Sequence, residues 1–441
     1  MTSPARADGS ETVRGHETMT KHPSGNLSHV LQTSETEAQM MKSGDGAWLM
    51  IAGALVLFMT PGLALFYGGM DRTRNVLNML MMNFWCLLIV PVLWVVVAYS
   101  LAQGGTGSYL GNLDWVGLKG IGIGDGGTHI AVIAYLGMFA VITPALISGA
   151  VADRIKFSAW AIFVPIWLIL VFCPVFKWVF GGWLSQRGSL DFAGGTAIHV
   201  NAGIAALAMV LVLGKRKGWP REGHPPHNMP MVMLGTGILW FGWFGFNAGS
   251  ALGANGTAVQ AFMNTFLAAA AGGLAWTLVE RARDGHFTNL GAASGIVAGL
   301  VAITPGAGFV SGMSPIFIGA IAGLICCFAV GLKSKLLYDD ALDVVGVHFV
   351  GGLVGSLLIG LFASPKYFGG EFRAGLFEGG GLSLLGEQAL ANGVTIVYSF
   401  AVTFALAHLL KATIGLRVDE ETEVNGLDLA EHAETAYHGT N

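Results

Sequence analysis

Eleven long apolar segments constrain this chain more than any other feature of its sequence. A bilayer core about 30 Å thick is crossed by about 20 helical residues at 1.5 Å each. Backbone polar groups have no water partners in hydrocarbon, so such segments cross as helices. The sequence therefore predicts an all-α polytopic membrane protein with spans at 47–70, 78–102, 129–150, 158–177, 192–213, 229–248, 258–280, 289–305, 314–331, 343–363 and 390–410.

The composition fits this class and excludes others. Of 441 residues 53% are hydrophobic and only 11% are charged, whereas soluble domains are about 25% charged. The net charge of −4 is too small to bear on nucleic acid, and no basic tract points to it, so we expect no nucleic-acid partner. The cysteines lie in apolar segments without the spacing of a disulfide framework or a metal site, and we expect neither metal nor cofactor. They are Cys86, Cys173, Cys326 and Cys327.

Lysine and arginine decide the orientation of the spans. With the N-terminus outside, the inner loops and the end of the chain carry fourteen of these residues and the outer loops carry five. Cytoplasmic loops are normally enriched in positive charge. Because an odd number of spans places the termini on opposite sides, the sequence predicts an N-out, C-in topology in a bilayer.

The apolar segments are evenly distributed, which predicts one membrane domain over residues 43–411. Residues 1–42 are polar and lack the continuous apolar core of a signal peptide. We expect them to form a poorly ordered extracytoplasmic extension. Residues 412–441 are acidic and too polar to span, so we predict a cytoplasmic tail that docks on a partner or on the inner face of the protein.

Two histidines lie inside apolar spans, His199 and His348. Ionisable groups at bilayer depth are rare and usually mark a functional path. A glycine follows each histidine by four residues, Gly203 and Gly352. Eleven spans divide as five, five and one, so the histidines occupy the fifth span of each half. Halves of five spans insert with opposite topology, which predicts an inverted repeat with the imidazoles side by side and one additional peripheral helix.

An aspartate precedes each histidine. Asp191 lies eight residues before His199, and Asp343 lies five residues before His348. Aspartate at a helix start accepts hydrogen bonds from free backbone N–H groups and complements the helix dipole. We expect both residues to cap their helices, a role compatible with attracting a cation to the mouth of a path.

Several long blocks resemble the ammonium transporter family (Amt/MEP, related to Rh proteins) and its Amt-type members in particular. The resemblance runs from about Asp45 to His438. The blocks are ALVLFMTPGLALFYGGMDRTRNVL (54–77), FAVITPALISGAVADRIKFSAW (139–160), GSLDFAGGTAIHVNAG (188–203), WFGWFGFNAGSA (240–251), YDDALDVVGVHFVGG (338–352) and GLRVDEETEVNGLDLAEHAE (415–434).

The resemblance implies a homotrimer in which each subunit has its own narrow pore. His199 and His348 match the twin histidines whose rings share a hydrogen bond at the pore midpoint. The other implied positions are Phe139 and Phe246, stacked at the outer entrance; Ser250, the serine of an outer cation site; Asp191, near that site; and Trp243, which lines the pore.

The chain departs from the family at two outer positions. Phe180 stands where the family usually has an outer-site tryptophan, and one glycine of the following run is missing. Phenylalanine is a weaker cation–π partner than tryptophan, and Trp178 or Trp183 is an alternative partner. Tyr135 stands where the upper entrance often has another phenylalanine, which adds a hydroxyl beside the gate.

The function that follows is transport of ammonium. NH₄⁺ would bind at the outer site and lose its proton, and NH₃ would pass the histidines, with or without a separately relayed proton.

Alternatives are an ammonium sensor that signals through the tail, and an Rh-like channel for neutral NH₃ or CO₂. An intramembrane enzyme is disfavoured because a third metal ligand and the common catalytic motifs are absent from the sequence. A PII-type signalling protein is the implied cytoplasmic partner, and the bacterial plasma (inner) membrane the implied location.

Overall fold

A computed structural model describes residues 43–124, 127–221, 223–370 and 372–437. The predicted extension at 1–42 lies outside these ranges. Within them the chain forms eleven helical spans, and the prediction of an all-α, eleven-span protein is confirmed. The spans cover Ser43–Met70, Val76–Gln103, Thr128–Val151, Phe157–Arg187, Gly195–Leu213, Met229–Gly249, Gly256–Asp284, Asn289–Gly306, Ser314–Leu336, Val345–Phe362 and Ser383–Thr413.

Most predicted span boundaries lie within about five residues of these, but two spans extend further. Helical structure continues to Arg187 rather than 177 in the fourth span, and begins at Ser383 rather than 390 in the eleventh. The extra turns carry polar residues that an average over a 20-residue apolar window excludes.

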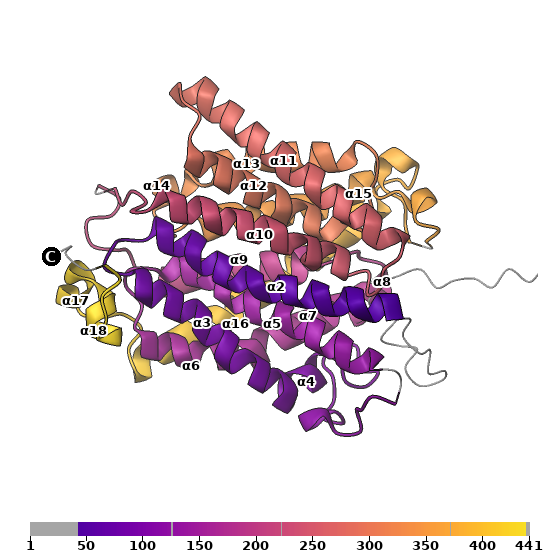
Figure 1. The fold of residues 1–441 in the computed structure, drawn as a ribbon, viewed down its shortest axis with the longest axis horizontal. Helices are drawn as coiled ribbons and strands as arrows, with labels where there is room; N and C mark the ends of the chain where they lie inside the picture. Colours follow the sequence, from indigo (N-terminus) through magenta and orange to yellow (C-terminus); the bar gives the residue numbers. More distant parts are fainter. Residues whose placement is uncertain (1–42, 125–126, 222, 371, 438–441) are drawn as a thin grey trace, which may run out of the picture.

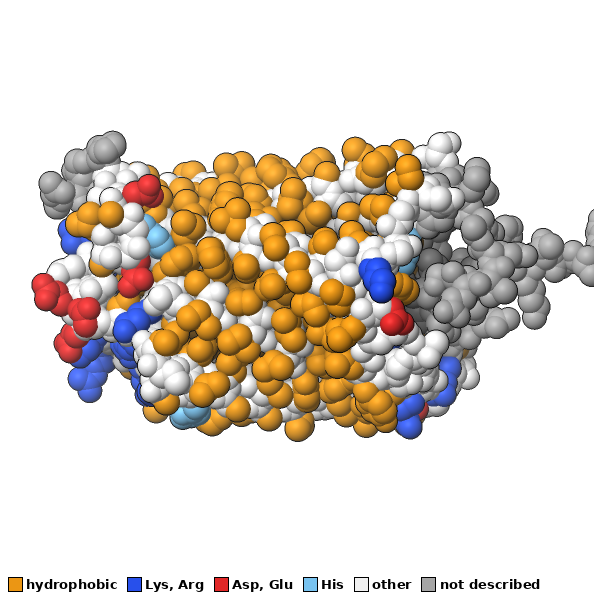
Figure 2. Space-filling view, turned by 90° about the horizontal axis from the view of Figure 1, so that it is seen from below, with side chains coloured by type: hydrophobic (Ala, Val, Ile, Leu, Met, Phe, Trp, Pro, Cys, Tyr) orange, Lys and Arg blue, Asp and Glu red, His pale blue; other side chains and the backbone are white. Residues whose placement is uncertain are grey.

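The spans form one bundle (Figure 1). Figure 2 shows a continuous hydrophobic belt, with charged side chains gathered at the two ends. Helix α2 (Ser43–Met70) starts at the end opposite the tail helices α17 (Glu420–Asn425) and α18 (Leu427–His432). We call the end with the tail helices the inner end and the opposite end the outer end.

Several spans are built from more than one helical piece. The second joins α3 (Val76–Leu93), the π-helical η2 (Trp94–Ala98) and α4 (Tyr99–Gln103). The fourth joins α6 (Phe157–Trp167), π-helical η4 (Leu168–Phe172), α7 (Cys173–Val179) and, after a turn, α8 (Trp183–Arg187). Both π segments begin three residues after a proline, which lacks the N–H group of a regular helix and clashes with the preceding turn.

The histidine-bearing spans also begin as π-helices. Their pieces are η5 (Gly195–Val200) with α9 (Asn201–Leu213), and η7 (Val345–Phe349) with α15 (Val350–Phe362). Short π segments frequently occur at functional sites. The remaining spans are α5 (Thr128–Val151), α10 (Met229–Gly249), α11 (Gly256–Asp284), α12 (Asn289–Ile303) with η6 (Thr304–Gly306), α13 (Ser314–Ala329) with α14 (Leu332–Leu336), and α16 (Ser383–Thr413).

Glycines allow the helices of the second half to pack with their backbones in contact. A Cβ built on Gly323 of α13 would lie 2.3 Å from the carbonyl oxygen of Gly272 in α11, and one on Gly272 would lie 2.8 Å from the Cα of Gly299 in α12. Helices in lipid associate through such close van der Waals contact. This packing accounts for part of the high glycine content of the chain.

A buried charge network ties the inner loops together. Arg216 forms ion pairs with Asp339 at 2.8 Å and with Asp153 at 2.9 Å. Asp153 also forms an ion pair with Arg72 at 2.9 Å. The tail packs against this network: Arg72 Nη2 donates to the carbonyl oxygen of Glu423 at 2.7 Å. The inner ends of spans far apart in sequence are therefore joined by charge-assisted hydrogen bonds.

Candidate functional site

The two predicted intramembrane histidines meet at the centre of the bundle. Their Nδ1 atoms lie 3.3 Å apart, and the rings stack with centroids 5.4 Å apart and planes 17° apart. Both side chains are buried, with 2% exposure each. Because an Nδ1–Nδ1 hydrogen bond has one donor and one acceptor, the rings take opposite protonation at these atoms. Nε2 of His199 is buried and has no hydrogen-bond partner among the described residues.

The glycine four residues after each histidine marks the crossing of the two helices. A Cβ on Gly203 would lie 2.5 Å from the backbone nitrogen of Phe349, the residue after His348. A Cβ on Gly352 would lie 3.0 Å from the Cβ of His199. The repeated spacing thus has a steric cause, since each helix leaves room for the histidine region of the other.

Gly203→Ala is expected to separate the helices at this crossing, because the added methyl meets backbone atoms that have no rotamer to change. Overpacking of this kind costs about 1–3 kcal/mol, and we expect the loss of most transport activity. Transport in proteoliposomes and the thermal midpoint measure both effects. Gly237→Ala is the matched control because its Cβ enters open space. Equal behaviour of the two variants would contradict the crossing geometry.

Asp191 caps the His199 segment, as predicted. Its two carboxylate oxygens accept hydrogen bonds from the backbone N–H groups of residues 194–197 at 2.7–3.0 Å. Burial raises the pKa of Asp191 to about 6, against the opposing effect of these four donors. The carboxylate is thus committed to the helix start rather than free to bind another group.

The predicted cap of the His348 segment was wrong. Asp340, rather than Asp343, accepts the N–H groups of Val344 and Val345, at 3.1 and 2.6 Å. Asp343 instead adopts a positive φ of 64° and pairs with Lys333 at 2.6 Å. The sequence held the signal, because Asp340 precedes His348 by eight residues, the spacing of Asp191 and His199.

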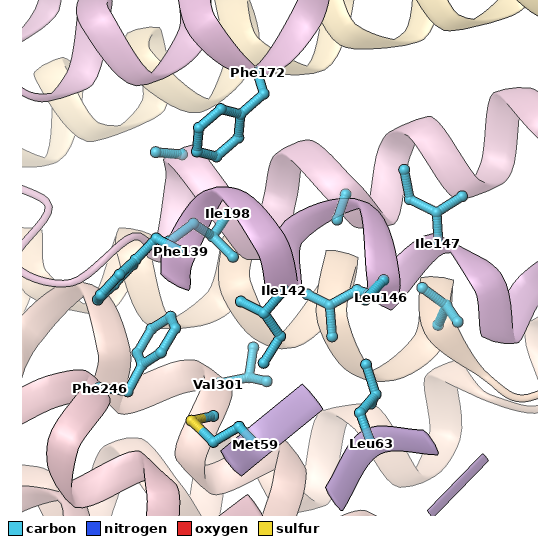
Figure 3. Packing of buried hydrophobic residues seen from close by; sticks show 14 of the residues in the cluster. Met59, Leu63, Phe139, Ile142, Leu146, Ile147, Phe172, Ile198, Phe246 and Val301 are labelled. Atoms are coloured by element: carbon cyan, nitrogen blue, oxygen red, sulfur yellow. The ribbon is translucent and has the colours of Figure 1, made fainter. Parts of the chain in front are cut away.

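Two stacked phenylalanines lie on the outer side of the histidines. The rings of Phe139 (α5) and Phe246 (α10) are 4.2 Å apart with planes 26° apart (Figure 3). Phe246 also lies 6.0 Å from the ring of His199. Both phenylalanines are buried.

Tyr135 and Ser250 lie beside the phenylalanines. Ser250 donates to the carbonyl oxygen of Phe246 at 2.9 Å, and its hydroxyl lies 3.2 Å from that of Tyr135. The Tyr135 hydroxyl is also 2.8 Å from the carbonyl oxygen of Phe246, and its ring is edge-on to Phe139 at 5.1 Å. Predicted outer-site residues from two helices therefore form one cluster.

Trp243 and Tyr67 flank the histidine pair. Trp243 stacks on His199 with centroids 5.4 Å apart, and its indole N–H donates to Thr304 at 2.8 Å. Tyr67 was not predicted; its hydroxyl lies 3.5 Å from Nε2 of His348. A tyrosine in an apolar helix carries no sequence signal for this role. A small cavity follows on the inner side, lined by Phe66, Tyr67, Met70, Ser294, Leu342, Asp343, Val347 and His348.

Phe180 is buried but makes its closest described ring contact with Phe176, at 4.7 Å, rather than with Phe139. Trp178 and Trp183 belong to a different group of aromatic side chains. Trp178 packs edge-on against Tyr398 at 4.7 Å, and Trp183 lies 6.3 Å from Trp178. The described ring contacts therefore join neither tryptophan to the Phe139–Phe246 pair.

Comparison with known proteins decides the family. A model of the Ammonium Transporter Family matches residues 47–437. The chain belongs to the ammonium transporter family. It is 51% identical over 429 residues to an ammonium transporter of Mycobacterium tuberculosis, covering 89% of this chain and 90% of that one. An ammonium transporter of Bacillus subtilis is 46% identical, covering 90% and 99% of the two chains.

Solved structures of similar proteins have the same fold. Candida albicans Mep2 superposes with a TM-score of 0.83 at 34% identity, covering 92% of this chain and 93% of that one. A structure described as a sensor Amt protein gives a TM-score of 0.83 at 28% identity. The chain is thus a multi-pass membrane transporter for ammonium and not an enzyme. Among the described residues no cluster of three His, Cys, Asp or Glu side chains could hold a metal.

Proposed function

We propose that this ammonium transporter removes a proton from NH₄⁺ at the outer cluster and passes NH₃ between the histidines. The outer cluster consists of Phe139, Phe246, Tyr135 and Ser250. The observation that carries this proposal is the unpartnered, buried Nε2 of His199 beside the shared Nδ1 hydrogen bond. Buried polar atoms are nearly always hydrogen-bonded. An exception at the centre of an apolar path offers a hydrogen bond to a small polar molecule that passes it.

The outer cluster supplies what a cation needs before it loses its proton. The faces of Phe139 and Phe246 attract cations, each contact contributing about 0.5–2 kcal/mol. Ser250 and Tyr135 offer hydroxyl oxygens next to these rings. Phe180 lies in the outer part of the fourth span and provides a further aromatic face. In our proposal the weakly held cation is recruited here, and Asp191 contributes only through its fixed negative charge.

Discrimination against K⁺ follows from the cost of moving charge through an apolar pore. A charge at the centre of a membrane costs at least about 2.5–3.5 kcal/mol, which the two neutral imidazoles do not offset. NH₃ avoids this cost because its proton has been removed, whereas K⁺ cannot lose its charge. Trp243 keeps the His199 ring in place by stacking.

The released proton has a hydrogen-bonded route of its own. Imidazole can accept a proton at one nitrogen and release another, and the His348 ring connects His199 to Tyr67 at the inner side. A relay along these groups would recombine the proton with NH₃ inside, and net transport would be electrogenic. Neutral NH₃ conduction of the Rh type is the alternative, in which the proton stays outside.

Proteoliposomes on a solid-supported membrane test the mechanism. An ammonium pulse is expected to give a transient current, and a K⁺ pulse of equal concentration is expected to give none. The reason is that ammonium can cross as a separate proton and NH₃, whereas K⁺ cannot. Ammonium uptake without current would reject the relay and favour neutral conduction. Absence of uptake would reject the transport proposal as a whole.

A second candidate function is sensing. Its specific support is the fold shared with a sensor Amt protein, together with a tail that bonds the inner loops through Glu423. In this proposal occupancy of the pore changes the tail, which reports to a PII-type signalling protein. Stoichiometric PII binding that depends on ammonium but not on flux would favour sensing.

We also propose that the chain works as a homotrimer in the bacterial plasma membrane.

A further inference from the structure

A row of polar residues runs along one face of α16, the helix outside the two halves of the repeat. The row follows helical spacing within an otherwise apolar span, and all its members are buried. Such residues in membrane helices usually bond neighbouring helices. The row consists of Gln388, Asn392, Thr395, Ser399 and Thr403.

Two members of this row meet both histidine-bearing helices at one place. Asn392 Nδ2 donates to the Ser356 hydroxyl at 2.7 Å, and Gln388 Nε2 donates to the same oxygen at 3.0 Å. The hydroxyls of Ser356 and Thr196 lie 3.2 Å apart, and Thr196 donates to Asn392 Oδ1 at 3.2 Å. Exposure of these four side chains is 0–2%.

The single hydroxyl proton of Thr196 fixes the direction of the hydrogen bonds in this cluster. Thr196 donates it to Asn392 Oδ1, so the Ser356 hydroxyl must be the donor toward the Thr196 oxygen. The Ser356 oxygen accepts from Asn392 Nδ2, and Gln388 Nε2 shares its two protons among the hydroxyl and carbonyl oxygens of Ser356 and the carbonyl oxygen of Leu190. Thr196, Asn392 and Ser356 thus form a closed ring of hydrogen bonds, and the loss of one hydroxyl leaves a buried amide or hydroxyl unpaired.

The ring is close in sequence to both histidines. Thr196 lies one turn before His199 within η5, and Ser356 lies two turns after His348 on the continuous helix of η7 and α15. The symmetry-related positions in the repeat are Val345, three before His348, and Leu207, eight after His199. These side chains are apolar, so the two helices are tied by this type of ring on the outer side of the pair only.

We propose that the Thr196–Asn392–Ser356 ring is a positioning element that sets the separation of His199 and His348. This inference rests on the proposed transport mechanism, because only that mechanism requires a fixed distance between the rings. Without the ring, the remaining described hydrogen bonds between α15 and the start of the His199 segment run through Gln388, which bonds Ser356 and the backbone of Leu190, further from the histidine pair. The Nδ1–Nδ1 hydrogen bond then loses its fixed geometry, and NH₃ passage slows.

The test uses Thr196→Val, which keeps the side-chain shape and removes the hydroxyl. The maximal ammonium current per folded transporter is expected to fall at least fivefold in proteoliposomes, with the half-saturating concentration unchanged because the outer cluster is intact. Thr196→Ser retains the hydroxyl and should keep more than half of the current. Thr403→Val is the matched control; it removes a buried hydroxyl of α16 that bonds Trp167 instead.

A second readout is independent of transport. Nitrogen-15 NMR of the histidine rings in lipid should show changed Nδ1 signals in Thr196→Val and unchanged signals in Thr403→Val. Equal losses of current in the two valine variants, or unchanged histidine signals in Thr196→Val, would overturn the positioning role. If the wild-type protein gives no current while the histidine signals shift as expected, the mechanism fails and the structural tie stands.

Discussion

Replacing His348 with glutamate is expected to give a protein that passes K⁺. The carboxylate would place a fixed negative charge at the level where the wild-type pair is neutral, and this charge offsets part of the desolvation cost that excludes K⁺. A K⁺ pulse should then produce a current at least tenfold above the wild-type background. His199→Asp is expected to act in the same direction, because both rings belong to one hydrogen-bonded pair.

The control for this experiment is His408→Glu, which adds the same charge on an exposed side chain of α16. It should leave K⁺ excluded. Ammonium current in each variant shows that the protein is folded and inserted. Continued exclusion of K⁺ by both pore variants, with ammonium current retained, would contradict the proposal that the histidine level discriminates between charged and neutral cargo.

Arg216→Met is expected to cause the largest loss of stability among single substitutions at the inner end. Arg216 contacts two buried carboxylates, Asp153 and Asp339, and its removal leaves both without their shared cation. Removing one partner of a buried ion pair costs about 3–5 kcal/mol, because the other charge stays buried without its partner. We expect a clear drop in the thermal midpoint of the detergent-solubilised protein. Size-exclusion chromatography after heating measures this midpoint.

Arg283→Met is the matched control, because the side chains of Arg283 and Asp284 are both about half exposed. Exposed pairs contribute about 0–1 kcal/mol, so this variant should melt close to wild type. Equal melting of Arg216→Met and wild type would show that the network contributes little.

Acid should reduce the difference between Arg216→Met and wild type. Burial opposes ionisation of Asp339, but the hydrogen bonds and charges of Arg216 and Arg154 outweigh it and lower its pKa. A carboxyl whose pKa is lowered by folding stabilises the protein above its unfolded pKa of about 3.9, and this contribution is lost as pH falls through the folded value. The melting difference should therefore be full near pH 7 and shrink below about pH 4. A difference that is constant over this range would argue against the ion pair as its cause.

The histidine pair was predictable from sequence because its signals are local. Each histidine interrupts an apolar span, and Gly203 and Gly352 follow at the same distance. The cap of His199 was predictable for the same reason. Asp340 was missed because Asp343 lies nearer the apolar run, although the eight-residue spacing of the other half pointed to Asp340.

The outer cluster was predictable only in part. The resemblance to ammonium transporters named Phe139, Phe246, Ser250 and Tyr135, and these residues do lie together. The neighbours of Phe180 could not be predicted, because a turn separates α7 from α8 and its geometry decides which rings meet.

The sequence alone determined the number of spans, their boundaries to within a few residues in most cases, and the positions of the two histidines. These follow from hydrophobic length and from the rarity of ionisable residues in lipid, both of which are properties of short windows of chain. Only the tertiary structure decided that Thr196, Ser356 and Asn392 form one ring, and that Tyr67 lies against His348. Hydroxyl and amide groups in a membrane must find partners inside the protein, and which partner each finds depends on contacts between residues up to about 280 positions apart.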